Sequence, residues 1–279
     1  MTEPLFCSVE LAQRIERAEA QFIAAGTAAA IRRHPGRAFT TPIAGGFACF
    51  ADDGAPFNKV VGIGFGGLPD EAALAEVESA YEARGAAVQV ELAHMADPEI
   101  AALLTGRGYR LVAFENVLGS LLPRGRSGPT PDGIVVGECT DDELEAWIDV
   151  VVTGFAHPDD QGTPTHEDFP REIVERAERD LVAAGARTYL ARIDGTVVGG
   201  GGLQITDGVA QLVGAATAPR HRRRGVQTAL LATRLADAAA AGCDIAVVTT
   251  APGSKSQQNV QRQGFHVLYT RAVLVKVPE

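Results

Sequence analysis

Apolar residues alternate with small or polar ones in three consecutive segments of the second half of the chain. These segments read "ARTYLARI", "TVVGGGGLQI" and "VAQLVGAAT". Asp194-Gly195 and Asp207-Gly208 separate them, and Asp-Gly between alternating runs is typical of a tight β-hairpin. The pattern therefore predicts an antiparallel meander of three strands.

The sequence predicts helices both before and after this meander. One face of a segment of about 15 residues carries four apolar side chains among alanines, namely Val226, Leu230, Leu231 and Leu235. Further helices are expected after the capping box formed by Thr140 and Glu143, over about 170–184, and from the capping box at Ser254 to Gly264. With strands at "GIVVGECT" and "DIAVVTT", the order β-α-α-β-β-β-α-β-α-β predicts a mixed sheet with helices on both faces.

The first half of the chain ends in the same way as the second. "LLTGRGYRLVAFENVLGSLL" and "NVQRQGFHVLYTRAVLVKV" both place a short helix, a glycine, an aromatic residue and a strand in that order. Gly108 and Gly264 lie 156 positions apart, and the helix-ending Gly85 and Gly242 lie 157 apart. A nearly constant offset over this distance predicts a duplication.

A segment rich in Pro, Gly and Ser, "PRGRSGPTPDG" at 123–133, separates these halves. We therefore predict an N-terminal domain over 1–122, a linker over 123–133 and a C-terminal domain over 134–279.

The composition narrows the class of protein. The chain has 279 residues, 46% of them hydrophobic, with a net charge of −10, and no window reaches the roughly 18 uninterrupted apolar residues that a membrane span needs. The N-terminus lacks a secretory pattern, and the four cysteines are scattered without a CxxC. A soluble cytoplasmic protein is expected, with no membrane partner, and its acidity argues against nucleic acid as a partner.

One short stretch opposes this acidity. "APRHRRRGVQTALL", residues 218–231, places four arginines between the strand that ends in "VGAAT" and a helix that begins near Gly225. A helix N-terminus has unpaired N–H groups and a partial positive charge, and glycine allows a ligand to approach the main chain. The stretch predicts a site for a pyrophosphate-sized anion. A solvated basic patch or a nucleic-acid contact is the alternative.

The segment "RHRRRGVQTALL" resembles the pyrophosphate-binding signature Arg/Gln-x-x-Gly-x-Gly/Ala of the GNAT superfamily of N-acetyltransferases. Arg222 and Gly225 match this signature, whereas Gln227 stands where glycine or alanine is usual. The resemblance covers the second half, and because the first half repeats the plan, the chain is similar to tandem GNAT proteins with a degenerate N-terminal copy. It implies an α+β (mixed α/β) fold with two tandem GNAT-like domains, each a mixed, largely antiparallel sheet flanked by helices on both faces.

The resemblance also implies a function. Acetyl-CoA would be the co-substrate, no metal would be needed, and the acetyl group would pass to an amine, which we expect on a small molecule. The sequence leaves open whether the protein forms a homodimer. The residues expected to bind acetyl-CoA are Ala215, Ala216, Thr217, Arg222, Arg223, Arg224, Gly225, Val226, Gln227, Thr228 and Asn259.

The groups that would transfer protons are harder to assign. Many GNAT enzymes carry a tyrosine four residues before the Gly-Phe pair, but this chain has Val260 there. Tyr269 and Glu138 are weak catalytic candidates, with a plain sheet aromatic and an exposed carboxylate as the alternatives. A loop expected to shape the acceptor pocket contains His157, Asp159, Asp160, His166 and Glu167.

The first half contains a second glycine motif. Gly62, Gly64 and Gly67 have GxGxxG spacing, with Glu91 further on, which mimics a dinucleotide-binding fingerprint. However, the helix is expected to start only after Pro69, which the offset matches to Gly225, and its first turn carries two acidic residues, Asp70 and Glu71. Close packing explains these glycines better.

Two other functions remain open. A cofactor-binding regulatory protein without turnover would fit the missing tyrosine, and an NAD-type enzyme would use the glycines of the first half.

Overall fold

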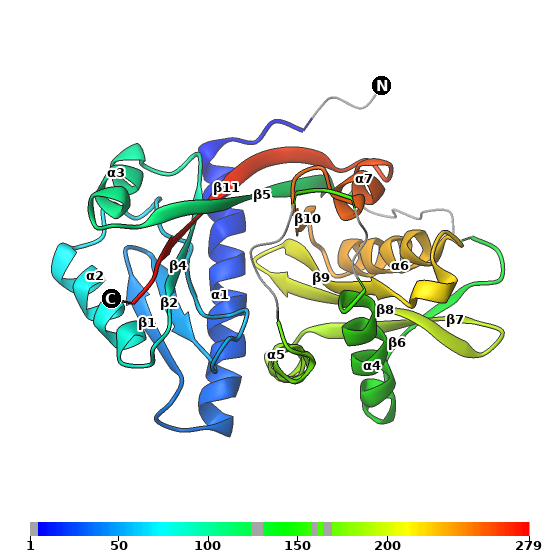
Figure 1. Cartoon of the computed structure of the whole chain (residues 1–279). Coiled ribbons are helices and arrows are strands. Elements are labelled where there is room, and N and C mark those ends of the chain that lie inside the picture. The colour runs from blue at the N-terminus through cyan, green and yellow to red at the C-terminus, as the bar shows by residue number, and fades with distance from the viewer. Residues whose placement is uncertain (1–4, 124–130, 158–160, 164–168, 279) are drawn as a thin grey trace. The chain divides into compact units, whose positions relative to one another are not determined.

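The fold is a mixed α+β fold, as predicted. The computed structural model describes residues 5–123, 131–157, 161–163 and 169–278. The chain forms two compact units (Figure 1). The C-terminal unit contains Leu118–Thr163 and Gly185–His266, and the N-terminal unit contains Phe6–Val117, Pro164–Ala184 and Val267–Glu279.

The C-terminal unit is built on the predicted meander. Its strands are β6 (Val135–Glu138), β7 (Arg187–Ile193), β8 (Thr196–Thr206), β9 (Val209–Thr217) and β10 (Ile245–Thr250). They lie in the order β10-β9-β8-β7-β6, and the end of β5 (Arg110–Leu121) lies beside β10. Both predicted hairpins are confirmed, because Asp194-Gly195 and Asp207-Gly208 all have positive φ, as a type I′ turn requires.

Helices cover both faces of this sheet. They are η1 (Asp141–Glu143), α4 (Leu144–Phe155), η2 (Pro219–His221), α6 (Val226–Ala240) and α7 (Lys255–Gln261). Figure 1 shows α4 and α6 on opposite faces of the β7–β9 meander. Two adjacent glycines of β8 explain how closely the helices approach: a Cβ on Gly199 would lie 2.7 Å from Val226 of α6, and one on Gly200 would lie 2.8 Å from Val151 of α4.

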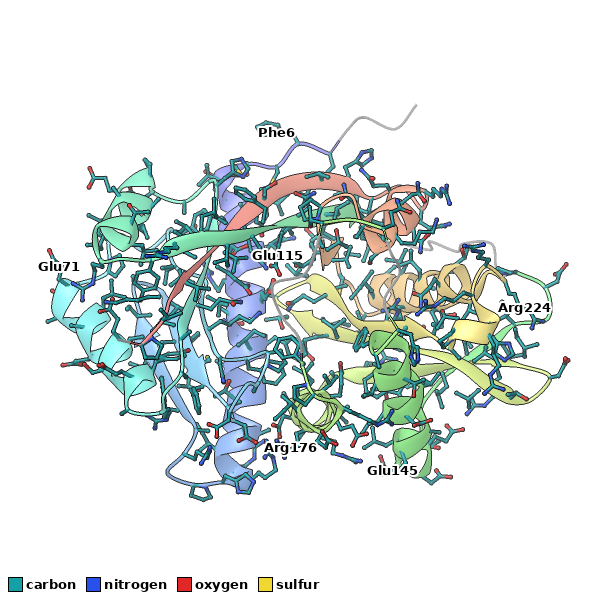
Figure 2. All side chains as sticks on the ribbon, viewed as in Figure 1. Phe6, Glu71, Glu115, Glu145, Arg176 and Arg224 are labelled. Carbon is teal, nitrogen blue, oxygen red and sulfur yellow. The ribbon has the colours of Figure 1, made fainter. Side chains whose placement is uncertain are left out.

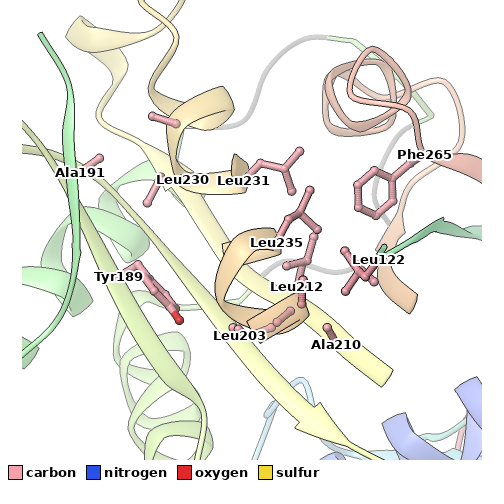
Figure 3. Close-up of a cluster of buried hydrophobic side chains, with 14 of the residues drawn as sticks. Leu122, Tyr189, Ala191, Leu203, Ala210, Leu212, Leu230, Leu231, Leu235 and Phe265 are labelled. Carbon is pink, nitrogen blue, oxygen red and sulfur yellow. The ribbon is translucent and has the colours of Figure 1, made fainter. Parts of the chain in front are cut away.

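The main core of the C-terminal unit lies under α6. Leu230, Leu231 and Leu235 of α6 pack against Leu203 and Leu212 of the sheet (Figure 3). These α6 residues belong to the apolar face that the sequence predicted.

The N-terminal unit contains elements from both halves of the chain. Its elements are α1 (Val9–Arg33), β1 (Phe39–Ile43), β2 (Gly46–Phe50), β3 (Lys59–Val61), α2 (Glu71–Glu82), β4 (Val88–Ala93), α3 (Pro98–Gly106), most of β5, α5 (Arg171–Ala183) and β11 (His266–Lys276). The strand order is β1-β2-β3-β4-β11-β5. Thus β11, the last strand of the chain, fills the position between β4 and β5 and runs antiparallel to β4.

The same order of elements occurs twice along the chain. A helix, three strands, a helix, a strand, a helix and a strand follow one another from α1 to β5 and again from α5 to β11. The compact units nevertheless interleave, because α5 and β11 belong to the N-terminal unit. The domain boundaries 1–122 and 134–279 therefore describe the repeated sequence and stay a prediction; 124–130 of the linker lie outside the described residues.

A buried group of charged side chains attaches β11 to the N-terminal unit. The Arg271 guanidinium is 1% exposed and donates to Glu16 Oε1 at 2.7 Å and to Glu19 Oε1 at 2.9 Å. Glu91 and Glu115 lie 3.6 and 3.9 Å from the same guanidinium. We call these five residues the Arg271 cluster. Burial, followed by the neighbouring Glu91, raises the pKa of Glu115 to about 8.

Glu178 on α5 allows a test of how the burial of a carboxyl group changes the pH dependence of the free energy of unfolding. Burial raises the pKa of this carboxyl to about 7, above its ordinary value of 4.5. Between these pH values the folded chain holds a proton that the unfolded chain releases, so the contribution of Glu178 to stability is fully present below pH 4.5 and is lost as pH rises through 7. Glu178→Gln should remove about 2.5 kcal/mol of this pH dependence between pH 5 and pH 8. Urea unfolding of wild type and variant at both pH values measures the change in unfolding free energy. Equal slopes in both proteins would contradict the prediction.

Candidate cofactor site at the start of helix α6

Strands β9 and β10 separate beside the start of α6. They pair in parallel from Ile245↔Val209 to Val247↔Gln211, and β9 then continues to Thr217. The segment after Gln211 has six residues, and at 3.3 Å per residue it extends for roughly 20 Å. It offers main-chain groups on the side away from β8, so an extended ligand with amide groups can lie along it.

A β-bulge lies within this open segment. Gly200 pairs with Ala216 and Gly202 with Val213, so three steps on β9 match two on β8, and Gly214 has a φ of 56°. Among the residues predicted to bind acetyl-CoA, Ala215 is exposed, whereas Ala216 and Thr217 are buried. Ala216 lies close to α4: a Cβ added to Gly154 of α4 would lie 2.4 Å from the Cβ of Ala216.

The loop between β9 and α6 has the backbone of an anion site. Arg223 has a φ of 61° and Gly225 a φ of 86°, with Arg224 at negative φ between them. Such alternation of hand directs successive N–H groups into one concavity. An arginine in the left-handed region is also strained, and strain of this kind collects at ligand sites.

The arginine side chains of this loop differ in their surroundings. Arg222 donates from Nη2 to the carbonyl oxygens of Gly154, at 3.2 Å, and of His157, so it binds the C-terminal end of α4. Arg223 and Arg224 are exposed, and Arg224 lies 3.3 Å from the His221 ring (Figure 2). The structure thus gives Arg222 a part in fixing the loop, beyond the charge that the sequence suggested.

The first turn of α6 joins the loop to β9. Gln227, the residue that departs from the GNAT signature, donates from Nε2 to Thr217 Oγ1 at 2.9 Å. Val226 is 2% exposed and points into the core, which leaves its main chain for a ligand, whereas Thr228 is half-buried. Asn259 is half-buried on α7, which follows β10. Except for Asn259, the residues predicted to bind acetyl-CoA therefore lie on the end of β9, the loop and the first turn of α6.

The starts of α2 and α6 differ as the sequence predicted. Asp70 caps α2 and accepts from the main-chain N–H groups of Ala72 and Ala73 at 2.9 and 3.1 Å. Gly225 caps α6 with no side-chain hydrogen bond in the described structure. The matching cap residues are thus Asp70 and Gly225, one position away from the predicted match of Pro69 with Gly225.

The glycines of the first half have packing roles. A Cβ on Gly62 would lie 2.6 Å from Ala20 of α1, and one on Gly64 would lie 2.3 Å from Ala96. Helix α2 begins at Glu71, beyond all three glycines of the motif. These contacts support the packing explanation over the dinucleotide fingerprint.

The weak catalytic candidates have structural partners. Tyr269 belongs to the N-terminal unit, is 1% exposed and donates its hydroxyl to Glu16 at 2.6 Å. Glu138 accepts two hydrogen bonds from Arg187, at 3.0 and 2.6 Å, and this guanidinium lowers its pKa. A base with a lowered pKa accepts a proton less readily. Val260 packs against the core under α6.

The predicted acceptor loop is described only in part. His157 is exposed, and its Nδ1 lies 2.9 Å from the Thr153 carbonyl oxygen. Asp159, Asp160, His166 and Glu167 lie outside the described residues. Within the described ranges, no group of three His, Cys, Asp or Glu side chains is arranged to hold a metal ion, and no helix is both long and apolar enough to cross a membrane.

Comparison with solved structures identifies the class of fold. A GCN5-related N-acetyltransferase from Kribbella flavida superposes with a TM-score of 0.67 at 21% identity, over 95% of each chain. A tandem GNAT protein from the clavulanic acid biosynthesis pathway gives 0.61 at 14% identity, over 98% of this chain and 97% of that one. A GCN5-related N-acetyltransferase from Sphaerobacter thermophilus gives 0.56 at 18%, over 98% and 94%. The fold is that of GNAT proteins.

The sequence supports the same assignment for most of the C-terminal unit. Residues 154–265 match the acetyltransferase (GNAT) family, so this region resembles a GNAT acetyltransferase domain in sequence as well as in fold. No curated protein matches the chain. The resemblance predicted from the arginine loop is thus confirmed, and the matched region contains the whole segment from β9 to α7.

Proposed function

We propose that the protein is an N-acetyltransferase that moves the acetyl group of acetyl-CoA to an amine of a small molecule. The observation that carries this proposal is the start of α6, which follows a left-handed, strained loop and has no side-chain cap among the described residues. A pyrophosphate suits such a site, because the helix dipole and the exposed arginines both favour negative charge.

The residues present fit the rest of the co-substrate. The open part of β9 supplies main-chain groups for an extended arm that carries amides, starting from Thr217 beside the loop. In the reaction, the neutral amine nitrogen forms a bond to the thioester carbonyl carbon, and the carbon–sulfur bond breaks with its electron pair on sulfur. The nitrogen loses one proton and the departing CoA thiolate takes one up, so the products are the N-acetylated amine and CoA with a free thiol. An N–H of β9 would stabilise the negative charge on the carbonyl oxygen.

A second function is favoured by one observation. Val260 is partly buried and packs against the apolar core, at a position where many GNAT enzymes carry a tyrosine that acts on the leaving thiolate. A protein that binds acetyl-CoA as a regulatory ligand without turnover would have this arrangement as well.

Three measurements separate these functions. Acetyl-CoA at 100 times its Kd should stabilise the fold by about 2.7 kcal/mol, whereas NADH at the same concentration should not. Incubation with acetyl-CoA and a panel of small amines should release free thiol in proportion to acetylated product. Binding without thiol release would support the regulatory function, and stabilisation by NADH alone would overturn the assignment of the site.

A further inference from the structure

Two glutamine side chains face each other on β8 and β9 without satisfying each other. Gln204 of β8 is directly opposite Gln211 of β9 in the antiparallel register, which places their Cβ atoms about 5 Å apart. Gln204 Oε1 and Gln211 Nε2 are both buried and have no hydrogen-bond partner in the described structure. An unused acceptor and an unused donor therefore belong to directly opposed residues of the two strands.

Both side chains lie on the face of the sheet opposite α6. Their strand neighbours Leu203 and Leu212 pack under α6 (Figure 3), and side chains alternate along a strand. Gly200, which has the same parity as Gln204 on β8, faces Val151 of α4. The pair of amides, which we call the Gln204/Gln211 pair, thus shares the α4 side of the sheet.

Gln211 also marks the place where β9 and β10 separate. It pairs with Val247 in the last step of the parallel register, immediately before the open segment of β9. An arm that starts at Gly225 and follows this segment away from Thr217 ends beside Gln211. An amine that attacks the end of this arm comes within reach of the Gln204/Gln211 pair.

A buried amide donor without a partner is unfavourable, because the group has lost its hydrogen bonds to water. Gln211 is 5% exposed, so this cost applies to it. A ligand group that accepts from Gln211 Nε2 and donates to Gln204 Oε1 would satisfy both atoms. A carboxamide does this with its C=O and N–H, whereas a carboxylate has no donor and would face the Gln204 carbonyl oxygen.

From this arrangement, and resting on the proposed function, we infer that the acceptor is an amine with a carboxamide next to it, and that the Gln204/Gln211 pair binds the carboxamide. The two glutamines are specificity-determining residues. They orient the amine and take no part in proton transfer.

Three small amines of similar size test this inference. L-Alaninamide carries the carboxamide, L-alanine replaces it with a carboxylate, and isopropylamine replaces it with a methyl group. Wild-type protein should acetylate alaninamide with a kcat/KM at least about tenfold above that of isopropylamine, and alanine should be the poorest of the three. Gln211→Met should reduce this preference to about twofold, mainly through a higher KM for alaninamide.

Comparing wild type with variant for one amine at a time removes the effect of differences in reactivity among the three amines. The amines differ in their own pKa, but each ratio of wild type to variant uses one amine, so this difference cancels. Gln21→Met, at an exposed position of α1, serves as the matched control and should keep the wild-type preference. Because Gln211 Nε2 has no partner to lose, Gln211→Met should not lower the melting temperature of the ligand-free protein.

A readout without turnover completes the test. With CoA present, alaninamide should shift one side-chain amide pair in a ¹⁵N–¹H spectrum, assigned to Gln211 by its absence in Gln211→Met, and isopropylamine should not. Absence of both this shift and the preference would overturn the inference, even if thiol release from other amines upheld acetyl transfer. If acetyl-CoA does not bind at all, the proposed function fails first.

Discussion

Gly225→Asp is expected to weaken acetyl-CoA binding at least about 100-fold, a loss of about 2.7 kcal/mol. An aspartate there places a negative charge beside the first N–H groups of α6, where it opposes the phosphates and the favourable helix dipole. Titration calorimetry at a fixed salt concentration measures the change.

Gly225→Asn is the matched control for charge. Asparagine and aspartate have the same shape and tolerate a φ of 86° about equally, and in both variants the new Cβ lies about 2.9 Å from Pro131. We expect Gly225→Asn to retain binding within about tenfold, because it adds a side chain of the same size but no charge. Asp70→Ala should leave the affinity unchanged. Equal losses in Gly225→Asp and Gly225→Asn would show that the effect is steric and would contradict the electrostatic explanation.

Arg271→Met is expected to destabilise the fold by about 3–5 kcal/mol. The substitution keeps a long apolar side chain but leaves Glu16, which is 3% exposed, without the guanidinium that balances its charge. Glu91 keeps its ion pair with Lys59 at 2.5 Å, so the loss falls mainly on Glu16. Urea unfolding followed by circular dichroism gives the free energy, with m unchanged if the folded and unfolded states keep their compactness.

A second substitution tests the cause of this loss. Adding Glu16→Gln to Arg271→Met removes one of the uncompensated carboxylates, so the double variant should regain at least about 1 kcal/mol. If Arg271→Met does not fold, Arg271→Lys keeps the charge and loses the fork geometry, and it should show an intermediate loss. A loss below about 1 kcal/mol in Arg271→Met would mean that the Arg271 cluster contributes little to stability.

Features set by a few neighbouring residues could be predicted from the sequence. Asp194-Gly195 forms its hairpin because the turn needs positive φ at both positions, and Thr140 with Glu143 forms its capping box by local hydrogen bonds. The anion loop belongs to this group, since Gly225 and its neighbouring arginines adjoin the helix that they start. The capping box predicted at Ser254 is confirmed in one half: Ser254 Oγ accepts from the Gln257 N–H at 3.2 Å. In the other half, Gln257 Oε1 accepts from the main-chain N–H of Gly253, whereas the predicted box required that of Ser254.

Features that join distant segments could not be predicted in this way. Nothing in "HVLYTRAVLVKV" shows that β11 pairs with β4, because an alternating strand fits any sheet with a free edge. Arg271 looks like an exposed charge in the sequence, and only its four carboxylate neighbours make its burial tolerable. The contact of Arg222 with α4 and the opposition of Gln204 and Gln211 likewise depend on the tertiary fold and on strand register.

Because β11 lies between β4 and β5 in the sheet, the N-terminal unit cannot complete its sheet in the order in which its strands are synthesised. A ribosome that has released every residue up to β5 has still not supplied the strand that lies beside β4, and a nascent chain must keep that edge unpaired until its last residues emerge. Neither half of the gene therefore encodes a self-sufficient piece, and a cut between them would leave the earlier product with an open, aggregation-prone seam.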